Sequence, residues 1–441
     1  MVRQALSWSG RQGARSTAFA GERPPSLRSA PRCRSAPRPL RVIDVVLFGL
    51  FVATLLGLAA FHRFALHIAV TGLVAVLLVR LGFTEFDLLH HLHHEWRILA
   101  NLAGLLLGFA LLAAHFEHSH LPEKLTEVLP RGRLGAFVLL LLVAGLSAVL
   151  DNIAAALIGG SSALALFRRR VHVGYLAAIV AASNAGGAGS VIGDTTTTMM
   201  WIEGASPTWL VGASIGAVVA IAFFGFFASG QQHRLQPLQR PDAPPPPVDA
   251  ARLVIVGAVI VGTVSTNVLL DFPAVGVWAA LLLGAPLRRP DWHLLPSAAK
   301  GTAFLLCLVL TASMMPVKSL PAASVPTTLA LGFVSSIFDN IPLTKLAIEQ
   351  GGYDWGLLAF AVGYGGSMLW FGSSAGVAIA GVFDEAKSVA KWLRHGWHVP
   401  VGYVLGFTAL WLVLGWTPRE LVRPGRHTAP TPDAPAVVEP R

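Results

Sequence analysis

Long uncharged apolar runs recur along almost the whole chain and are separated by short polar connections. A helix of about 20 apolar residues spans the roughly 30 Å hydrocarbon core of a bilayer. We therefore expect an all-α polytopic membrane protein with about ten spans. The runs that predict full spans are residues 42–60, 64–83, 98–115, 173–203, 208–229, 252–270, 273–287, 300–316, 355–383 and 397–416.

Residues 134–167 are too long for one span and too short for two. Their single charged residue, Asp151, lies at the middle of the run and is followed by Asn152. One straight helix of this length would measure about 51 Å, and two full spans would leave no residues for a turn. The length fits a re-entrant helical hairpin with Asp151-Asn152 at its tip.

Residues 325–350 repeat this pattern around Asp339-Asn340. Pro342 follows, and proline both removes a backbone donor and disfavours helix at the residue before it, so the chain should break here. Two hairpins with the same Asp-Asn tip predict two structural repeats.

Each hairpin is followed by a span that contains several glycines. The first reads SNAGGAGSVIGDTTTTMMW and the second GYGGSMLWFGSSAGVAIAG. Glycine lets the backbone leave the helix, and helices broken at matching positions of two halves are typical of a transporter site. At one constant offset, Gly186, Gly187, Gly193, Asp194 and Thr195 align with Gly365, Gly366, Gly372, Ser373 and Ser374.

Composition agrees with a membrane protein, because 54% of the residues are hydrophobic and 13% are charged, against about a quarter charged in soluble domains. Residues 1–41 contain nine Arg and one Glu and supply +8 of the formal net charge of +10. The basicity therefore belongs to this segment and does not indicate a nucleic-acid-binding surface. Cys33 and Cys307 predict neither a disulfide framework nor a thiol metal site.

The predicted organisation has five parts. They are a disordered basic tail at 1–41, for which a start codon assigned too far upstream is one explanation, a first transmembrane half at 42–229 with hairpin 134–167, a cytoplasmic proline-rich linker at 230–251, a second transmembrane half at 252–416 with hairpin 325–350, and a disordered tail at 417–441.

Charges beside the two hairpins predict their orientation. Arg133 and the arginines at 168–170 flank the first hairpin, and the positive-inside rule places both its ends in the cytoplasm. The second hairpin is flanked only by Lys318, Glu349 and Asp354 and should open outward, so the repeats are inverted. Counting the predicted spans back from the first hairpin places the Arg-rich tail outside, against the positive-inside rule. Either a span is missing from the count or the tail is not translated.

A carboxylate inside the bilayer costs several kcal/mol unless it is paired or lines a polar cavity, so we interpret Asp151, Asp194 and Asp339 as functional. Sodium is a hard cation that prefers the oxygen ligands of carboxylates, amides, hydroxyls and unwound backbone carbonyls. Desolvation favours the protonated carboxyl and a nearby cation favours the carboxylate, so one group can hold either ion. Asp194 has no acidic counterpart in the second repeat and is our first choice for that exchange.

Simpler structural roles are open for the same groups. The aspartates would then only hydrogen-bond the hairpin tips, Asp194 would be an N-cap of the next helix, and the threonines after it would bond their own backbone carbonyls. Lys345 and Glu349, four residues apart, predict an internal ion pair in preference to a gate. Histidines cluster at 89–96 and 115–120, as in membrane di-iron enzymes, but a third box is missing, so we prefer an interfacial connector.

Three motifs carry a resemblance to a known family. SNAGGAGSVIGDTTTTMMW resembles the first broken-helix signature of the NhaD-type sodium/proton antiporters, and FDNIPLTKLAIEQGG and VGYGGSMLWFGSSAGVA resemble that family's second-repeat motifs. The larger group is the ion-transporter superfamily, which includes arsenite permeases and citrate or dicarboxylate carriers. The resemblance covers about residues 45–416 and implies paired hairpins in an inverted repeat, elevator-type movement and a homodimer.

The resemblance also implies a set of ion-binding residues. The carboxylate carriers have Ser-Asn-Thr at both tips where this chain has Asp-Asn, and the added negative charge favours a cation. The first tip continues as Ile153-Ala154-Ala155 where NhaD-type chains have threonines, which leaves the identity of the cation open. By position the set is Asp151, Asn152, Asn184, Asp194, Thr195, Thr196, Asp339, Asn340, Ser373 and Ser374.

The leading hypothesis is a secondary active transporter that exchanges sodium (or lithium) for protons by alternating access in a bacterial-type inner (plasma) membrane. Its partners would be small ions and lipid, without nucleic acid, cofactor or transition metal. The alternatives are a sodium- or proton-coupled carrier of an anion such as citrate, a dicarboxylate or arsenite, and, more remotely, a His-box membrane enzyme.

Overall fold

A computed structural model describes residues 42–61, 64–239 and 246–421. Every described residue belongs to one contact unit, residues 39–441, and the other unit, residues 1–38, lies outside the described residues. The basic tail and most of the C-terminal tail predicted above are likewise outside them. In the described part of the chain all regular structure is helical and no strand occurs, as predicted.

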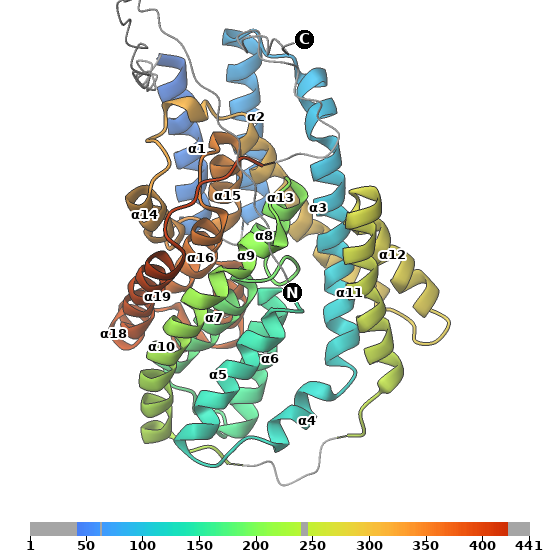
Figure 1. Cartoon of the computed structure of the whole chain (residues 1–441), viewed down its shortest axis with the longest axis vertical. Helices are drawn as coiled ribbons and strands as arrows, with labels where there is room; N and C mark the ends of the chain where they lie inside the picture. The colour runs from blue at the N-terminus through green and yellow to red at the C-terminus, as the bar shows by residue number, and fades with distance from the viewer. Residues whose placement is uncertain (1–41, 62–63, 240–245, 422–441) are drawn as a thin grey trace, which may run out of the picture. The chain divides into compact units, whose positions relative to one another are not determined.

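Ten helices precede the linker and nine follow it in the described residues (Figure 1). The first group is α1 (Val42–Ala60), α2 (Ala65–Phe83), α3 (Leu88–Glu117), α4 (Leu121–Glu127), α5 (Arg133–Ser147), α6 (Asn152–Leu166), α7 (Val173–Ala188), α8 (Thr195–Ile202), α9 (Pro207–Val211) and α10 (Ala213–Leu235). The second group is α11 (Ala250–Leu270), α12 (Pro273–Gly284), α13 (Leu295–Ser313), α14 (Val325–Ser335), α15 (Asn340–Gln350), α16 (Trp355–Gly365), α17 (Ser374–Val382), α18 (Val389–His395) and α19 (His398–Leu414). Short 3₁₀ turns lie at Trp292–Leu294, Val317–Ser319, Gly366–Met368 and Asp384–Lys387.

Several of these helices are long and apolar enough to cross a membrane. Within the described residues there are five, and a sixth if α18 and α19, which bend by 57° at a short break, count as one span. Shorter apolar helices make up most of the rest. Large apolar side chains remain exposed on the outer helices, for example Leu78 (64%), Val268 (74%) and Leu283 (83%). Lipid contact explains such exposure, and the chain is a multi-pass membrane protein.

Both predicted hairpins are present as pairs of helices. α5 packs against α6, and residues 148–151 separate them, which places Asp151-Asn152 at the tip. α14 and α15 contact each other across residues 336–339, so the second break falls at Asp339.

Both glycine-rich spans are broken where predicted, since α7 ends at Ala188 before α8 and α16 ends at Gly365 before α17. Close packing against the hairpins explains the glycines. A side chain at Gly186 would overlap the carbonyl oxygen of Ala144 in α5, and one at Gly365 would overlap that of Gly332 in α14. The aligned glycines therefore have equivalent neighbours in the two repeats.

The aligned pair Gly193 and Gly372 also lies against backbone carbonyls of the hairpins. A side chain at Gly193 would overlap the carbonyl oxygen of Ser147, and one at Gly372 would overlap that of Ser336. Each broken span thus lies directly against the end of the first helix of its hairpin. Any larger residue would separate the two backbones, which are in contact near the hairpin tips.

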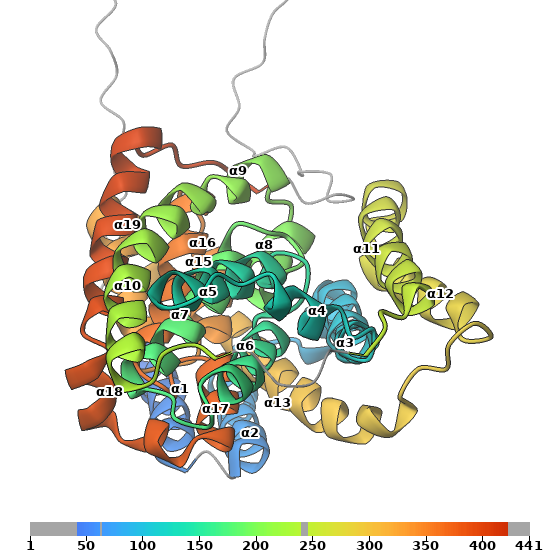
Figure 2. The ribbon, with the colours of Figure 1, turned by 90° about the horizontal axis from the view of Figure 1, so that it is seen from below.

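The centre of the fold is formed by α7 and α16, which pack together. Every residue of α16 and nearly every residue of α7 is buried, as expected for helices that are apolar on all sides. α10 packs on α7 and α19, whereas α11 and α12 pack on α3 at the opposite edge (Figure 2).

The linker is shorter than the predicted 230–251. α10 continues to Leu235 and α11 begins at Ala250, and residues 240–245 lie outside the described part. The polar end of α10 stays helical because Gln232 has partners: it donates to the carbonyls of Arg170 and Gln236 and accepts from the backbone N–H of His172.

Residues 417–421 correct the prediction of a free tail that begins at 417. Asp354 accepts hydrogen bonds from the N–H and the hydroxyl of Thr417 at 3.0 and 2.9 Å. Trp355 Nε1 donates to the carbonyl of Arg419 at 2.7 Å. The described end of the chain therefore packs on the start of α16, in contacts that a polar, proline-rich composition does not reveal.

Candidate functional site

Four helices begin inside the protein at residues that the sequence singled out. Asp151, Asp194 and Asp339 cap α6, α8 and α15, and Ser373 caps α17. Their side chains accept backbone N–H groups two or three residues ahead at 2.6–3.3 Å. The positive end of a helix dipole stabilises an ionised cap. The N-cap role considered for Asp194 is thus confirmed, and it extends to the other two aspartates.

Capping uses only one oxygen of each carboxylate. Within the described residues, the backbone hydrogen bonds to the three aspartates all reach Oδ1. Asp194 is 1% exposed, and its Oδ2 has no hydrogen-bond partner in this part of the chain. A buried carboxylate oxygen without a donor is costly, and either a proton or a cation would satisfy it.

An amide network joins the two repeats beside these caps. Asn152 Nδ2 donates to Asn184 Oδ1 at 3.0 Å, and Asn184 Nδ2 donates to the hydroxyls of Ser367 and Ser373, both at 3.0 Å. The tip of the first hairpin is therefore connected through α7 to the break of the second repeat. Asn340 is buried at the start of α15, but no hydrogen bond joins its side chain to this network among the described residues.

The repeats differ at one position of this contact. The glycine alignment pairs Asn184 with Gly363 and Ser373 with Asp194. Asn184 of the first repeat donates a hydrogen bond to Ser373 of the second. In the equivalent contact Gly363 of the second repeat faces Asp194 of the first, and a Cβ added at Gly363 would lie 3.0 Å from Asp194 Oδ2. Because Gly363 has no side chain, Asp194 receives no amide donor. The structure thereby explains why Asp194 keeps an oxygen for a ligand and Ser373 does not.

The hydroxyl groups after Asp194 fall into two sets. Thr197 and Thr198 donate to backbone carbonyls of the break and to that of Asp194, which is the structural role expected of threonines in membrane helices. Thr195 is half-buried, and Thr196 is buried with its N–H on Asp194 Oδ1. Thr195 and Thr196 are the ones that remain candidates for the ion site.

A cavity of about 520 Å³ lies between α3, α6, α13 and α17 and reaches Asp151. Its walls are mainly apolar, and its charged lining residues are Asp151 and Glu117. No Lys, Arg or His is among the described residues that line it. The cavity therefore connects the first hairpin tip with the end of α3 through a space that carries only negative charge.

A second cavity, of about 40 Å³, lies at the tip of the second hairpin. Asp339, Ser373 and Ser374 are its polar lining residues, and described residues with a positive charge are absent from its wall. A water molecule occupies about 30 Å³ of liquid volume, so this space suits one water or one dehydrated ion.

Sequence analysis missed two acidic residues near the candidate site. Lys345 in α15 contacts not only Glu349, at 2.7 Å, but also Glu95 and Glu203, each at 2.9 Å. The ammonium donates hydrogen bonds to Glu95 and Glu203 and forms an ion pair with Glu349. The available signal was that Glu203 ends the predicted span 173–203 and that Glu95 stands beside the histidines of 89–96, but nothing local to either residue points to Lys345.

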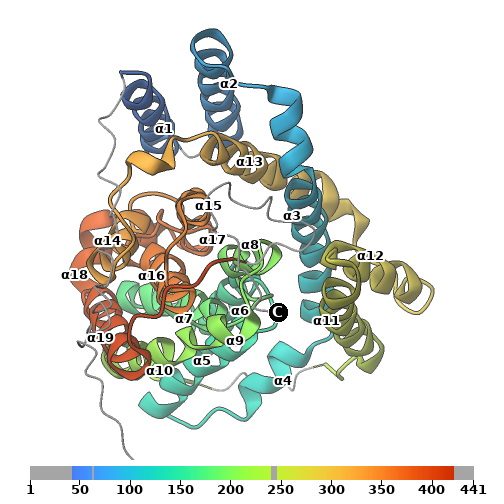
Figure 3. The ribbon, with the colours of Figure 1, turned by 45° about the horizontal axis from the view of Figure 1, so that its top comes forward.

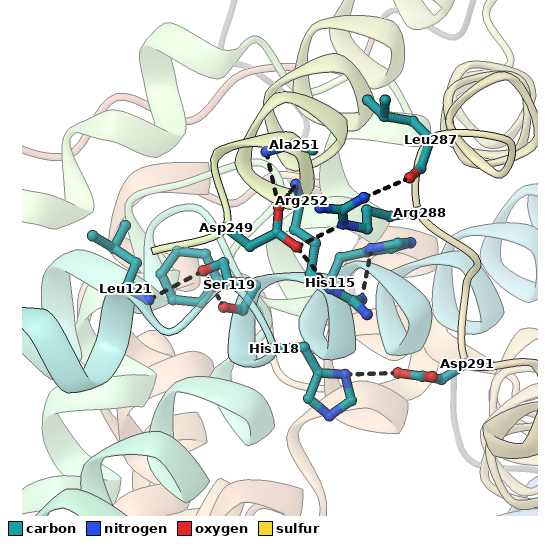
Figure 4. Close-up of polar contacts among 11 residues, drawn as sticks. His115, His118, Ser119, Leu121, Asp249, Ala251, Arg252, Leu287, Arg288 and Asp291 are labelled. Atoms are coloured by element: carbon teal, nitrogen blue, oxygen red, sulfur yellow. Dashed lines mark hydrogen bonds and ion pairs between the residues drawn. The ribbon is translucent and has the colours of Figure 1, made fainter. Parts of the chain in front are cut away.

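The histidines of 115–120 contribute to a polar network at one end of α3 (Figure 4). Arg252 Nη1 lies 3.3 Å from His115 Nδ1, and His118 Nδ1 lies 2.8 Å from Asp291 Oδ2. Asp249 caps α11 and binds Arg288 at 2.7 Å. The hydrogen bond from Arg288 holds the pKa of the Asp249 carboxyl below its ordinary value.

This network ties the start of α11 and the connection after α12 to the end of α3. The other cluster, 89–96, begins α3, and its His91 Nε2 lies 2.9 Å from the hydroxyl of Ser313. Within the described residues, the only group of three side chains close enough to share a metal ion is Glu95, Glu203 and Glu349, which contains no histidine.

Comparison with known proteins gives one family and several named relatives. A profile described as "Citrate transporter" (CitMHS) matches residues 50–365. "Sodium/proton antiporter 2" of Arabidopsis thaliana is 30% identical over 290 residues, which cover 53% of this chain and 66% of that protein. "Sodium/proton antiporter 1" of the same plant is 27% identical over 339 residues, which cover 67% and 58%. The "Na(+)/H(+) antiporter NhaD" of Halomonas elongata is 36% identical over 80 residues, which cover 17% and 16%.

The chain spans less than two thirds of the length of each of these relatives. The family match covers well over half of this chain and includes both hairpins and the first broken span. The helical fold with apolar spans agrees with a family of membrane transporters, and not of enzymes. The chain belongs to the citrate transporter family (CitMHS).

Proposed function

We propose that the chain exchanges sodium (or lithium) for protons by alternating access, and that Asp194 is the carboxylate that holds one or the other. The observation that carries the proposal is the buried Oδ2 of Asp194, which lacks a hydrogen-bond partner in the described residues where the two repeats meet. The three relatives named as sodium/proton antiporters support it. The transported ions replace any cofactor in this proposal.

Proton and cation compete for the same oxygen. When Asp194 is protonated, the acid is neutral and its burial costs little; when it is ionised, a dehydrated cation is needed to balance the charge. Thr195 and Thr196 directly follow it in the chain, and Asn184 bonds Ser373 in the adjoining network; their side chains carry oxygens of the kind that hard cations prefer. Asp339, Asn340, Ser373 and Ser374 would form the second half of the ion site, with Asp151 and Asn152 at the tip of the first hairpin.

The charge of the cavities favours a cation over the citrate that the family description suggests. Asp151 and Glu117 line the large cavity and Asp339 the small one, and neither has a basic lining residue in the described part. A tricarboxylate would meet only like charge there, which costs energy in a low-dielectric site. Lys345 offers no compensation because its ammonium already forms ion pairs with three carboxylates.

The sizes of the cavities fit alternating access. The space at Asp339 is about 40 Å³, too small for citrate, whereas that at Asp151 is about 520 Å³. A ligand would reach this conformation from the side of the first hairpin, which the positive residues beside that hairpin assign to the cytoplasm. Movement of the two hairpins relative to the rest, a homodimer, and a place in a bacterial-type inner membrane complete the proposal.

Purified protein in proteoliposomes with an imposed proton gradient tests the function. Sodium should collapse the gradient, and Asp194→Asn and Asp339→Asn should abolish that collapse. Collapse that needs added citrate, succinate or arsenite would support the anion carrier instead. Iron found by metal analysis of the same preparation would favour the His-box enzyme.

Asp384→Asn serves as the matched control. Asp384 lies outside the spans, its side chain is 90% exposed, and its ion-pair partner among the described residues is Lys387. Its loss should leave sodium-dependent collapse at the level of the parent protein. Equal loss of transport in the control and in Asp194→Asn would remove the case for a specific ion site.

A further inference from the structure

Lys345 connects three separate elements inside the protein. It lies in α15 and is 0% exposed, Glu95 lies in α3 and is 2% exposed, and Glu203 directly follows α8 and is 1% exposed. The lysine Nζ lies 2.9 Å from a carboxylate oxygen of each, and 2.7 Å from Glu349 in its own helix. These contacts join residues 250 and 142 positions apart in the chain.

Two of these elements also carry the caps of the candidate ion site. Asp339 caps α15, six residues before Lys345, and Asp194 caps α8, whose last residue precedes Glu203. α8 packs against α15 and α3, and Figure 3 shows it beside them near the middle of the molecule. The lysine therefore ties the middle of α15, whose N-terminus carries Asp339, to the C-terminal end of α8, whose N-terminus carries Asp194.

The charge of Lys345, and not only its volume, is needed for this link. Glu95 and Glu203 accept hydrogen bonds from the ammonium, and Glu349 forms a further ion pair with it, so three carboxylates surround its charge. Removal of one partner of a buried ion pair leaves uncompensated charge in a medium of low dielectric constant, and the structure must then rearrange. A neutral side chain of similar length would fill the space but release α15 from α8 and α3.

We propose that Lys345 is a positioning residue for the cation site: its ammonium holds α15 against α8 and α3 and thereby sets the place of Asp339 relative to Asp194. The inference rests on the proposed sodium/proton exchange only for its transport readout. Lys345 itself does not touch the ion.

The test combines sodium-dependent proton flux in proteoliposomes with hydrogen–deuterium exchange of the backbone. Lys345→Met should raise the apparent KM for sodium about tenfold and change kcat less than about threefold, because the site is displaced but not removed. Amide exchange should become faster in 195–203 and in 339–350. Lys345→Arg keeps the charge and should restore both values toward those of the parent protein.

Lys387→Met is the matched control, because Lys387 pairs with Asp384 at 2.6 Å with both side chains exposed. It should change neither KM nor exchange. If Lys345→Met does not fold, Glu203→Gln tests the proposal in its place. This variant keeps the shape of the side chain and removes one of the three negative charges around Lys345. It should raise KM in the same direction by a smaller factor.

Folded Lys345→Met with the parent KM, or with unchanged exchange in both segments, overturns the proposal. An effect of Lys345→Arg equal to that of Lys345→Met also overturns it, because the shape of the side chain and not its charge would then be responsible. If the parent protein carries no sodium, the proposed function fails, and amide exchange alone still decides the role of Lys345.

Discussion

The space beside Asp194 offers a sharp test of the ion site, because a single methyl group would enter it. Gly363 lies in the buried helix α16, and a Cβ there would lie 3.0 Å from Asp194 Oδ2 and 3.3 Å from the Cβ of Ala188. Both contacts are closer than ordinary van der Waals contact. Gly363→Ala should therefore crowd the oxygen that we propose as the cation ligand, while Asp194 itself stays in place.

Two opposing contributions set the size of the effect. Alanine is more favourable than glycine in a helix by about 1 kcal/mol, and overpacking a buried site costs about 1–3 kcal/mol. The free energy of unfolding should therefore fall by about 0–2 kcal/mol. Where the added methyl group opposes cation binding at Oδ2, an overpacking cost of about 1–3 kcal/mol weakens that binding. This cost corresponds to an increase of about 5- to 150-fold in the apparent KM for sodium.

The assay measures the apparent KM for sodium in proteoliposomes and the unfolding temperature in detergent. Gly381→Ala is the control, since it adds a methyl group to α17 with no atom within 4 Å. It should be neutral or stabilising and leave KM unchanged. A folded Gly363→Ala protein whose KM lies within about twofold of the parent value would refute the place of the cation at Asp194 Oδ2.

Two further predictions concern the amide network and the start of α11. Asn184→Ala removes three hydrogen bonds of 3.0 Å and leaves Asn152 without its acceptor. The free energy of unfolding, measured by chemical denaturation, should therefore fall by about 2–4 kcal/mol. A fall below about 1 kcal/mol would show that these hydrogen bonds do not stabilise the fold. Because Arg288 holds the pKa of Asp249 below its ordinary value, their ion pair should stabilise the fold above the ordinary pKa of an aspartate, about 4, and lose its effect as the pH falls through the lowered pKa. The difference in unfolding temperature between the parent and Asp249→Asn should accordingly shrink on acidification, and a difference that grows would contradict this reasoning.

The breaks of the helices could be predicted because their causes are local. An aspartate that caps the next helix and a pair of glycines each act within a few residues, so the breaks near Asp151 and Asp194 could be located from the chain alone. The break expected at Pro342 lies earlier, at 336–339, because proline fits the first turn of α15. The same reasoning overestimated the linker at 230–251. It extended the linker over the polar residues before the prolines, whereas Gln232 satisfies its amide inside the fold.

The partners of the polar groups could not be predicted in this way. Lys345 and Glu349 are neighbours on one helix face, and their pairing was expected, but Glu95 stands 250 positions away in a segment that drew attention for its histidines. Helix packing brings them together, and no local pattern records which helices pack.

Taken alone, the sequence determined that this is a helical membrane protein with two repeats, because hydrophobic length and glycine spacing are properties of short segments. It also identified Asp194 as the acidic residue without a counterpart. Only the tertiary structure decided why that asymmetry matters: Gly363 occupies the place of Asn184 and leaves Asp194 Oδ2 without a donor. The lack of a side chain at Gly363 matters only because Gly363 faces Asp194. That contact is set by the packing of α16 against α7 and α8.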